Sequence, residues 1–416
     1  MYALIDCNNF FVSCERAFNP ALRHRPVVVL SNNDGCVISR SNEAKALGIK
    51  MAVPFFQIRE LVEQHHVAVY STNFTLYGDM SDRVMKTLSG LVPDIEIYSV
   101  DEAFLHLHGI EDVASYSNHI VRTVTRNTGI SVSIGVAATK TLGKIANHFA
   151  KKYKAYNHVC VIDNEEKLVK ALQKTDIGDV WGIGRRHAKM LEYHGVKTAY
   201  DLTQKSRSWI RSKMTVIGER TWLELRGIAC IEKDELQAKK KQICTSRSFG
   251  QPITEYNTLL ESIASLAALS VAKLRKQKSV TKAVYIFAHT NRFGEEAYKS
   301  SKVVPLSFYT SDTGEIVGYC RQALDSIYVP HLEYKRAGVV LIDIIPEEYA
   351  LRDFFDEKDR DKQQRLNRVL DEINKKNGRD AIKLAIQGDG YSKNIRQEHL
   401  SKRYTTNFDE IIEIKV

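Results

Sequence analysis

Carboxylates stand at the ends of two strand-like segments that are far apart in this chain. Asp6 ends an apolar run that begins at Tyr2, and Asp101 and Glu102 interrupt an apolar run from Ile95 to Leu105. Adjacent residues of a regular strand point to opposite faces, so this pair can share a site only at a strand end or a hairpin bend. A carboxylate at the end of an apolar strand is costly without a partner, and Mg²⁺ is the natural partner of converging carboxylates. The pattern therefore predicts a two-metal centre.

Taken alone, an adjacent Asp-Glu pair favours a solvated surface turn. The residues around both segments favour a site instead. Asp6 is followed by Cys-Asn-Asn-Phe-Phe, and the pair lies within Ser-Val-Asp-Glu-Ala-Phe. These patterns closely resemble the two catalytic motifs of the Y-family DNA polymerases, which copy damaged templates. Segments 32–38, 43–48 and 140–147 resemble the UmuC branch of that family, and the resemblance extends through essentially the whole chain.

The resemblance implies a multidomain α/β (α+β) protein with a right-hand polymerase architecture of palm, fingers, helical thumb and βαββαβ little finger. The length of 416 residues agrees with about two to four domains. The predicted domains are a palm at 1–166 with fingers inserted at about 20–77, a thumb at 167–235, a basic linker at 236–242, a little finger at 243–350 and a charged C-terminal tail at 351–416.

Hydrophobic periodicity gives the expected elements. In the first domain the strand-like runs are 26–30, 67–70, 132–136 and 159–162, and the helix-like runs are 79–88 and 139–153. The predicted thumb is helical. After the linker the order is strand 243–249, helix 255–276, strand 282–290, strand 303–308, helix 313–328 and strand 338–345. This order predicts a four-stranded sheet with two helices on one face.

Composition narrows the class of protein. A net charge of +10 and a pI near 9.0 suggest a polyanionic partner such as nucleic acid, although a ribosomal or membrane-surface protein can have the same balance. No apolar stretch has the length of a membrane span, and the N-terminus lacks the pattern of a signal peptide. Seven cysteines without CxxC spacing indicate reduced thiols in the cytoplasm and argue against a zinc site.

By resemblance to the family, the three carboxylates bind two Mg²⁺ ions, with Mn²⁺ as a substitute. Asp6 and Asp101 are expected to bridge both ions. Glu102 is expected to complete the ion nearest the primer 3′ hydroxyl, and the Cys7 carbonyl to add a main-chain ligand. Phosphoryl transfer needs little beyond such positioning and positive charge.

Basic residues for the triphosphate are expected nearby. Residues 139–158 contain five lysines and no acidic residue, which is also the pattern of a solvated helix face. The resemblance places triphosphate contacts at Lys151 and Lys45, a phosphate contact at Ser39, and Lys144 facing the DNA.

Two aromatic residues follow the first catalytic motif. The resemblance places Phe11 beneath the sugar of the incoming dNTP, where a bulky ring excludes a 2′ hydroxyl by clash. Many UmuC-type chains have tyrosine there, and phenylalanine keeps the bulk. Phe10 is included among the nucleotide-binding residues but fits an ordinary core position better.

A Gly-x-Gly turn is predicted between two thumb helices. Gly182 and Gly184 precede a helix, and Arg185 and Arg186 follow them directly. The pattern is typical of a helix-hairpin-helix, whose backbone N–H groups bind a DNA phosphate without reading bases. A helix-breaking loop is the alternative for the tripeptide alone.

The tail carries a segment where UmuC-type proteins have a sliding-clamp peptide. Phe354 and Phe355 are the expected anchors, but Leu351 replaces the usual glutamine, and packing on the little finger is the alternative. The resemblance also implies a UmuD′-type dimer and a RecA filament as partners, together with primer-template DNA and dNTP.

Two other functions compete with a translesion polymerase. A non-catalytic DNA-binding scaffold would have no use for three clustered carboxylates beside DNA. A nucleotidyl cyclase has a palm-like two-metal site but needs no thumb, basic linker or little finger. The sequence therefore favours an error-prone DNA polymerase of the damage response.

Overall fold

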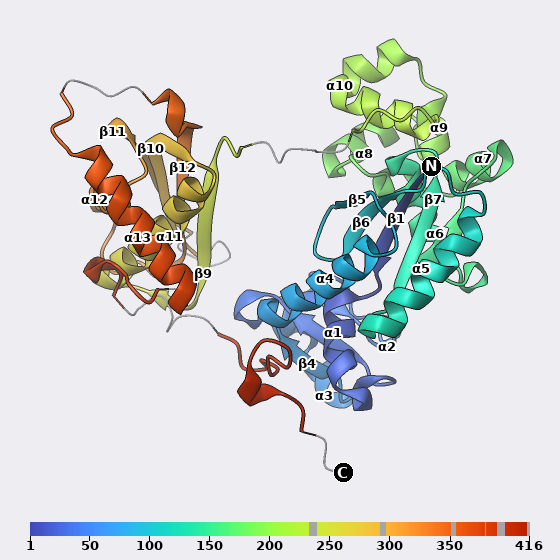
Figure 1. The fold of residues 1–416 in the computed structure, drawn as a ribbon, viewed down its shortest axis with the longest axis horizontal. Helices are drawn as coiled ribbons and strands as arrows, with labels where there is room; N and C mark the ends of the chain where they lie inside the picture. The colour runs from blue at the N-terminus through green and yellow to red at the C-terminus, as the bar shows by residue number, and fades with distance from the viewer. Residues whose placement is uncertain (233–238, 292–296, 351–354, 379, 389–395, 414–416) are drawn as a thin grey trace. The chain divides into compact units, whose positions relative to one another are not determined.

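The computed structural model describes residues 1–413 except 233–238, 292–296, 351–354, 379 and 389–395 (Figure 1). The chain forms two compact units, described separately here. The first contains Met1–Glu235 and Glu398–Val416, and the second contains Leu236–Gln397. The segment predicted as one tail therefore contributes to both units. Among the described residues, no helix is long and apolar enough to cross a membrane.

A five-stranded sheet forms the centre of the first unit. Its order is β5-β6-β1-β7-β8, and β1 pairs antiparallel with both of its neighbours. The strands are β1 (Tyr2–Cys7), β5 (Ile95–Ile97), β6 (Glu102–His106), β7 (Val132–Ala137) and β8 (Val159–Val161). Buried side chains of α4 (Phe74–Ser89) and α5 (Val113–Thr128) join the core on one face.

The helix α6 (Lys140–Lys152) packs against this sheet at very short range. A Cβ atom at Gly135 of β7 would lie 2.0 Å from the Asn147 backbone nitrogen and 2.4 Å from the Gly143 carbonyl oxygen. Only glycine permits this approach. The close packing brings the lysines of α6 to the sheet edge where β1 ends.

A smaller three-stranded sheet is inserted after α1 (Phe10–Phe18). Its order is β3-β2-β4, with β2 and β4 parallel. The strands are β2 (Val27–Leu30), β3 (Val37–Arg40) and β4 (Ala68–Ser71), and its helices are α2 (Asn42–Ala46) and α3 (Arg59–Gln64). It has a separate small apolar core.

The described part of the region that follows β8 is helical, as predicted. It contains α7 (Glu165–Gln173), α8 (Arg185–Tyr193), α9 (Ala199–Thr203) and α10 (Arg207–Leu225). Its apolar residues share one core with α6, so the helices are fixed to the sheet.

The second unit has the predicted βαββαβ order. Its sheet is antiparallel, in the order β11-β10-β12-β9. The elements are β9 (Ile243–Ile253), α11 (Tyr256–Lys276), β10 (Ser279–Thr290), β11 (Lys299–Thr310), α12 (Thr313–Ile327) and β12 (Tyr334–Pro346), followed by α13 (Arg360–Asn377). Each strand extends beyond its predicted bounds, because hydrogen bonding continues where the residues are polar.

Candidate active site

The carboxylates lie together at the edge of the five-stranded sheet that is formed by strand ends, where β1 ends and β6 begins. Asp6 and Glu102 face each other in the antiparallel register of β1 and β6, and the Cys7 N–H donates to the Asp101 carbonyl oxygen at 2.9 Å. The strands β5 and β6 form a hairpin whose bend contains Asp101. Tyr98 N–H donates across this bend to the Glu102 carbonyl oxygen at 3.0 Å. Two adjacent acids can share a site in this bend.

Ser99 fixes the conformation of the bend. Its hydroxyl donates to Asp101 Oδ1 at 2.6 Å and accepts the N–H groups of Asp101 and Glu102 at 3.2 and 3.0 Å. Sequence analysis did not single out Ser99. The signal was available, because serine two residues before an acid readily closes a local turn.

Each strand-borne carboxylate has a lysine of α6 as its partner. Lys151 pairs with Asp6, and Lys144 Nζ lies 2.8 Å from Glu102 Oε1. Burial raises the pKa of Asp6 to about 6 against the opposing effect of Lys151, and the charges of Glu102 and Asp101 raise it further. The three acids are therefore close enough to repel one another.

The carboxylates of this site have the chemistry of ligands for divalent metal ions. Within the described ranges, no three acidic, histidine or cysteine side chains already converge as ligands of one ion. Lysines neutralise two of the carboxylates instead. The donor set nevertheless fits, because three hard anionic groups meet at one sheet edge and a cation would relieve their repulsion.

Lys144 also lies among aromatic rings. Its Nζ atom is 4.7 Å from the ring centroid of Tyr98, 5.4 Å from that of Trp181 and 5.9 Å from that of Phe104. Trp181 Nε1 donates to the Tyr98 hydroxyl at 3.3 Å. The sequence predicts that Lys144 faces the DNA, and in the structure its Nζ atom pairs with Glu102. The group also links Trp181, in the turn before α8, to Glu102 through Lys144.

A second group of cations lies near Asp6. Burial lowers the pKa of Lys45, and the charges of Arg40 and Lys151 lower it further. Lys45 Nζ donates to Asn9 Oδ1 at 2.7 Å, a contact that sequence analysis missed. Ser39 lies on β3 and is buried.

Both units of the chain are similar in sequence to known proteins. Residues 5–148 match the impB/mucB/samB family, and residues 240–353 match its C-terminal domain. Residues 364–414 match a domain of unknown function. The UmuC protein of Salmonella typhimurium is 40% identical over 100% of both chains, and the ImpB protein of Salmonella typhimurium is 38% identical over 99% of both. The chain belongs to the UmuC branch of the Y-family DNA polymerases.

A solved Y-family DNA polymerase chimera has the same fold, with a TM-score of 0.65 at 19% identity, covering 83% of this chain and 99% of that chain. DNA polymerase IV of Staphylococcus epidermidis is 27% identical over 70% of this chain and 81% of its own length. The five-stranded sheet is accordingly the palm, the three-stranded sheet the fingers, α7 to α10 the thumb, and the sheet of the second unit the little finger.

The two aromatic residues at the start of α1 have different surroundings. Phe10 is 3% exposed and belongs to the palm core. Phe11 is half-buried and stacks on Tyr77 with 4.7 Å between ring centroids and an angle of 18°. Phe74 meets Phe11 edge to face at 6.2 Å. Phe11 thus presents a supported ring beside the catalytic motif.

The Gly-x-Gly turn of the thumb has the geometry of a helix entry. Gly182 has a φ of 89°, which favours glycine, and Gly184 is the N-terminal cap of α8. Arg185 and Arg186 form the first turn and are exposed. Backbone N–H groups at such a helix start attract anions.

The predicted clamp-binding residues of the tail, Phe354 and Phe355, complete the set of predicted sites. Phe354 lies outside the described residues, and Phe355 is 84% exposed.

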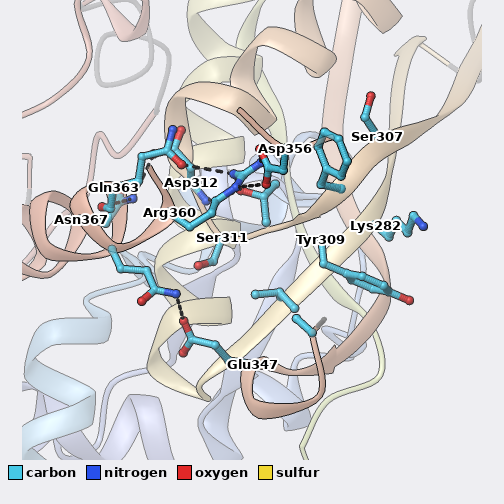
Figure 2. Close-up of a pocket in the computed structure, with 15 residues that line it drawn as sticks. Lys282, Ser307, Tyr309, Ser311, Asp312, Glu347, Asp356, Arg360, Gln363 and Asn367 are labelled. Carbon is cyan, nitrogen blue, oxygen red and sulfur yellow. Dashed lines mark hydrogen bonds and ion pairs between the residues drawn. The ribbon is translucent and has the colours of Figure 1, made fainter. Parts of the chain in front are cut away.

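A polar pocket lies between β10, β11 and α13, where Arg360 Nε pairs with Asp356 Oδ2 at 2.5 Å (Figure 2). Gln364 Nε2 donates there to Glu347 Oε1 at 2.7 Å. These groups pair with one another, and the described lining contains none of the predicted catalytic residues.

Proposed function

We propose that the palm edge formed by Asp6, Asp101 and Glu102 catalyses nucleotidyl transfer from dNTP to the primer 3′ hydroxyl. The chain is a DNA-directed DNA polymerase of a family that performs error-prone translesion synthesis in the damage response. The observation that carries the proposal is the pairing of Asp6 with Glu102 across β1 and β6, with Asp101 in the adjacent bend. In the reaction the 3′ oxygen bonds to the α-phosphorus, and the bond from that phosphorus to pyrophosphate breaks.

Y-family polymerases depend on divalent metal ions. In this proposal Asp6 and Asp101 hold two Mg²⁺ ions, and Glu102 and the Cys7 carbonyl complete the ligand set, with Mn²⁺ as a substitute. Bound ions would make the 3′ hydroxyl more acidic and neutralise the triphosphate. The residues of the chain hold these ligands in place, with Ser99 fixing the bend and α6 bringing lysines to the same edge.

The cations beside Asp6 suit a triphosphate. The charges of Lys151 and Arg40 both repel that of Lys45, and a polyanion would relieve this repulsion. Ser39 is proposed as a phosphate contact. Phe11 is proposed as the steric barrier to a 2′ hydroxyl, supported by the stacked Tyr77.

Primer-template DNA is proposed to contact the thumb as well as the palm edge. The backbone at Gly182 and Gly184, with Arg185 and Arg186, is proposed to bind phosphates without reading sequence. Lys144 is proposed to approach DNA when it leaves Glu102. The palm, thumb and little finger are assigned to 1–166, 167–235 and 243–350, with the basic linker at 236–242. Because its substrate is DNA, the protein is proposed to act in the cytoplasm, at the nucleoid.

Accessory partners follow from the family. A sliding clamp would bind Phe354 and Phe355, and a UmuD′-type dimer and a RecA filament would regulate the enzyme. Binding of a peptide spanning 348–358 to the clamp tests the first of these. No binding would reject the clamp site.

Primer extension tests the central proposal. Wild-type protein should extend a primer on undamaged and abasic templates with dNTP and Mg²⁺, and Asp101→Asn should not, while it still binds DNA. Glu111→Gln, an exposed acid of the same domain, is the matched control and should extend normally. Substantial Mg²⁺-dependent extension by Asp101→Asn would reject the assignment. Turnover of nucleotide without primer and template would indicate a cyclase instead.

A further inference from the structure

The C-terminal segment 398–413 packs on the helix that carries Phe11. The residues Phe11, Glu15 and Phe18 are spaced i, i+4 and i+7 on α1, so they lie on one helical face. Tyr404 stacks on Phe18 with 4.9 Å between ring centroids and an angle of 13°. Ser401 Oγ donates to Glu15 Oε1 at 2.9 Å. In Figure 1 the segment, drawn in red, lies beside the blue elements of the first unit.

The contact continues from Glu15 to Phe11 through one further side chain. The Tyr77 hydroxyl donates to the same oxygen, Glu15 Oε1, at 2.6 Å. Tyr77 and Glu15 are 1% and 2% exposed. Burial and the neighbouring Glu15 carboxylate raise the pKa of Tyr77, so its hydroxyl stays protonated and remains a donor. The ring of Tyr77 is the surface on which Phe11 stacks.

The same segment is bound to both sides of this cluster. Asn73 caps α4, the helix that carries Tyr77, and its Nδ2 donates to the Ser401 carbonyl oxygen at 3.1 Å and to Ser401 Oγ at 3.0 Å. At the end of β4, Ser71 N–H donates to the His399 carbonyl oxygen at 2.9 Å, and His399 N–H returns a bond to Ser71 Oγ at 3.0 Å. The segment is therefore held by backbone as well as side-chain contacts.

We propose that the segment 398–413 positions Phe11 and thereby sets the discrimination of the enzyme against ribonucleotides. Ser401 is the positioning residue, acting through Glu15 and Tyr77. This gives a role to part of the region that matches a domain of unknown function. The inference rests on the proposed role of Phe11 as a steric barrier.

The buried Glu15 carboxylate depends on its two hydroxyl donors, Tyr77 and Ser401. Burial raises the pKa of Glu15, and the Ser401 hydrogen bond opposes this effect. Without the Ser401 hydroxyl, the Glu15 carboxylate loses a donor and must move, admit water or take up a proton. Movement of Glu15 releases the Tyr77 hydroxyl that fixes its ring. Phe11 then loses a stable surface to stack on, and the space beneath the sugar widens.

The test compares ribonucleotide with deoxynucleotide incorporation opposite one template base in the full-length protein. Ser401→Ala should raise the kcat/KM of the ribonucleotide about tenfold relative to that of the deoxynucleotide, a change that corresponds to one hydrogen bond. Ser401→Thr keeps the hydroxyl and should behave as wild type. Phe408→Ala, at a 91% exposed position of the same segment, is the matched control and should change nothing. Phe11→Ala should give a larger loss of discrimination.

A spectroscopic measurement separates positioning from general damage. With 4-fluorophenylalanine at position 11, Ser401→Ala should shift or broaden the ¹⁹F signal, whereas Phe408→Ala should leave it unchanged. Loss of discrimination in Phe11→Ala without any in Ser401→Ala would overturn the inference alone. If Ser401→Ala lowered kcat/KM equally for the ribonucleotide and the deoxynucleotide, the inference would also be overturned. Unchanged discrimination in Phe11→Ala would reject the steric barrier, and the inference with it.

Discussion

Two carboxylate groups of the first unit, the partly exposed acids of the palm edge and the buried Glu15, are stabilised in different ways. At the palm edge, Asp6 and Glu102 pair with lysines, and Asp101 stands beside them. On the buried face of α1, Glu15 accepts hydrogen bonds from the hydroxyls of Tyr77 and Ser401. A lysine is a mobile cation that a metal ion or a substrate can replace, whereas a hydroxyl donor in a packed core is fixed. The palm edge can therefore exchange its lysine partners for other cations, whereas the hydrogen bonds of Glu15 keep the surrounding side chains in fixed positions.

The largest expected effect comes from replacing one carboxylate of each group by its amide. Glu102→Gln should reduce primer extension by roughly a hundredfold or more, because a metal ligand loses its charge. Glu15→Gln keeps an acceptor for both hydroxyls and should retain most activity. Steady-state primer extension on one template measures the activity of both variants. If Glu15→Gln lost as much activity as Glu102→Gln, the two groups would not differ in the way described.

A large effect on stability is expected at Glu15. Glu15→Ala leaves the buried Tyr77 hydroxyl and the partly buried Ser401 hydroxyl without their acceptor, and should lower the free energy of unfolding by about 2–3 kcal/mol. Glu102→Ala, at the partly exposed edge, should change it far less, because removing one of three repelling acids relieves repulsion. Denaturant unfolding of both variants measures the difference. Equal losses would contradict the assignment of Glu15 to a structural role.

Local patterns in the sequence predicted a large part of this arrangement. The two acidic motifs predicted that Asp6, Asp101 and Glu102 converge, with the adjacent pair at a strand end or a hairpin bend. Hydrophobic periodicity predicted the βαββαβ order of the second unit. Strand ends were placed less well. The strand β11 begins at Lys299 instead of at residue 303, because backbone pairing continues through residues whose side chains show no apolar pattern.

Contacts between distant residues could not be predicted in this way. Ser401 and Glu15 are separated by 386 positions, and no motif around either residue indicates that they form a hydrogen bond. The aromatic group around Lys144 combines Tyr98 from the palm hairpin with Trp181 from the thumb. Such contacts depend on how whole elements pack, which a single sequence does not display.

A moderate effect is expected from the lysine of the exchangeable group. Lys144→Met keeps an apolar chain among the aromatic rings but removes the charge that competes for Glu102. The Mg²⁺ concentration for half-maximal extension should therefore fall by about tenfold. Lys152→Met, an exposed lysine of the same helix, is the matched control and should leave it unchanged. A rise in the Mg²⁺ requirement would show that Lys144 supports metal binding rather than competing with it.

The smallest expected effect concerns cations outside both groups. Arg185 and Arg186 are exposed at the start of α8, where water and salt screen their charges. A single Arg185→Ala change should weaken DNA binding only severalfold, equally on all sequences, and reduce the slope of log affinity against log salt by about one. Lys189→Ala, an exposed residue one turn further along the same helix, should change the slope less, because it lies away from the N–H groups that bind the phosphate. Binding of primer-template duplexes of two different sequences, measured across a salt series, decides between these outcomes. A loss confined to one sequence would mean that the thumb reads bases, and an unchanged slope would mean that the Gly-x-Gly turn is a structural connection between helices.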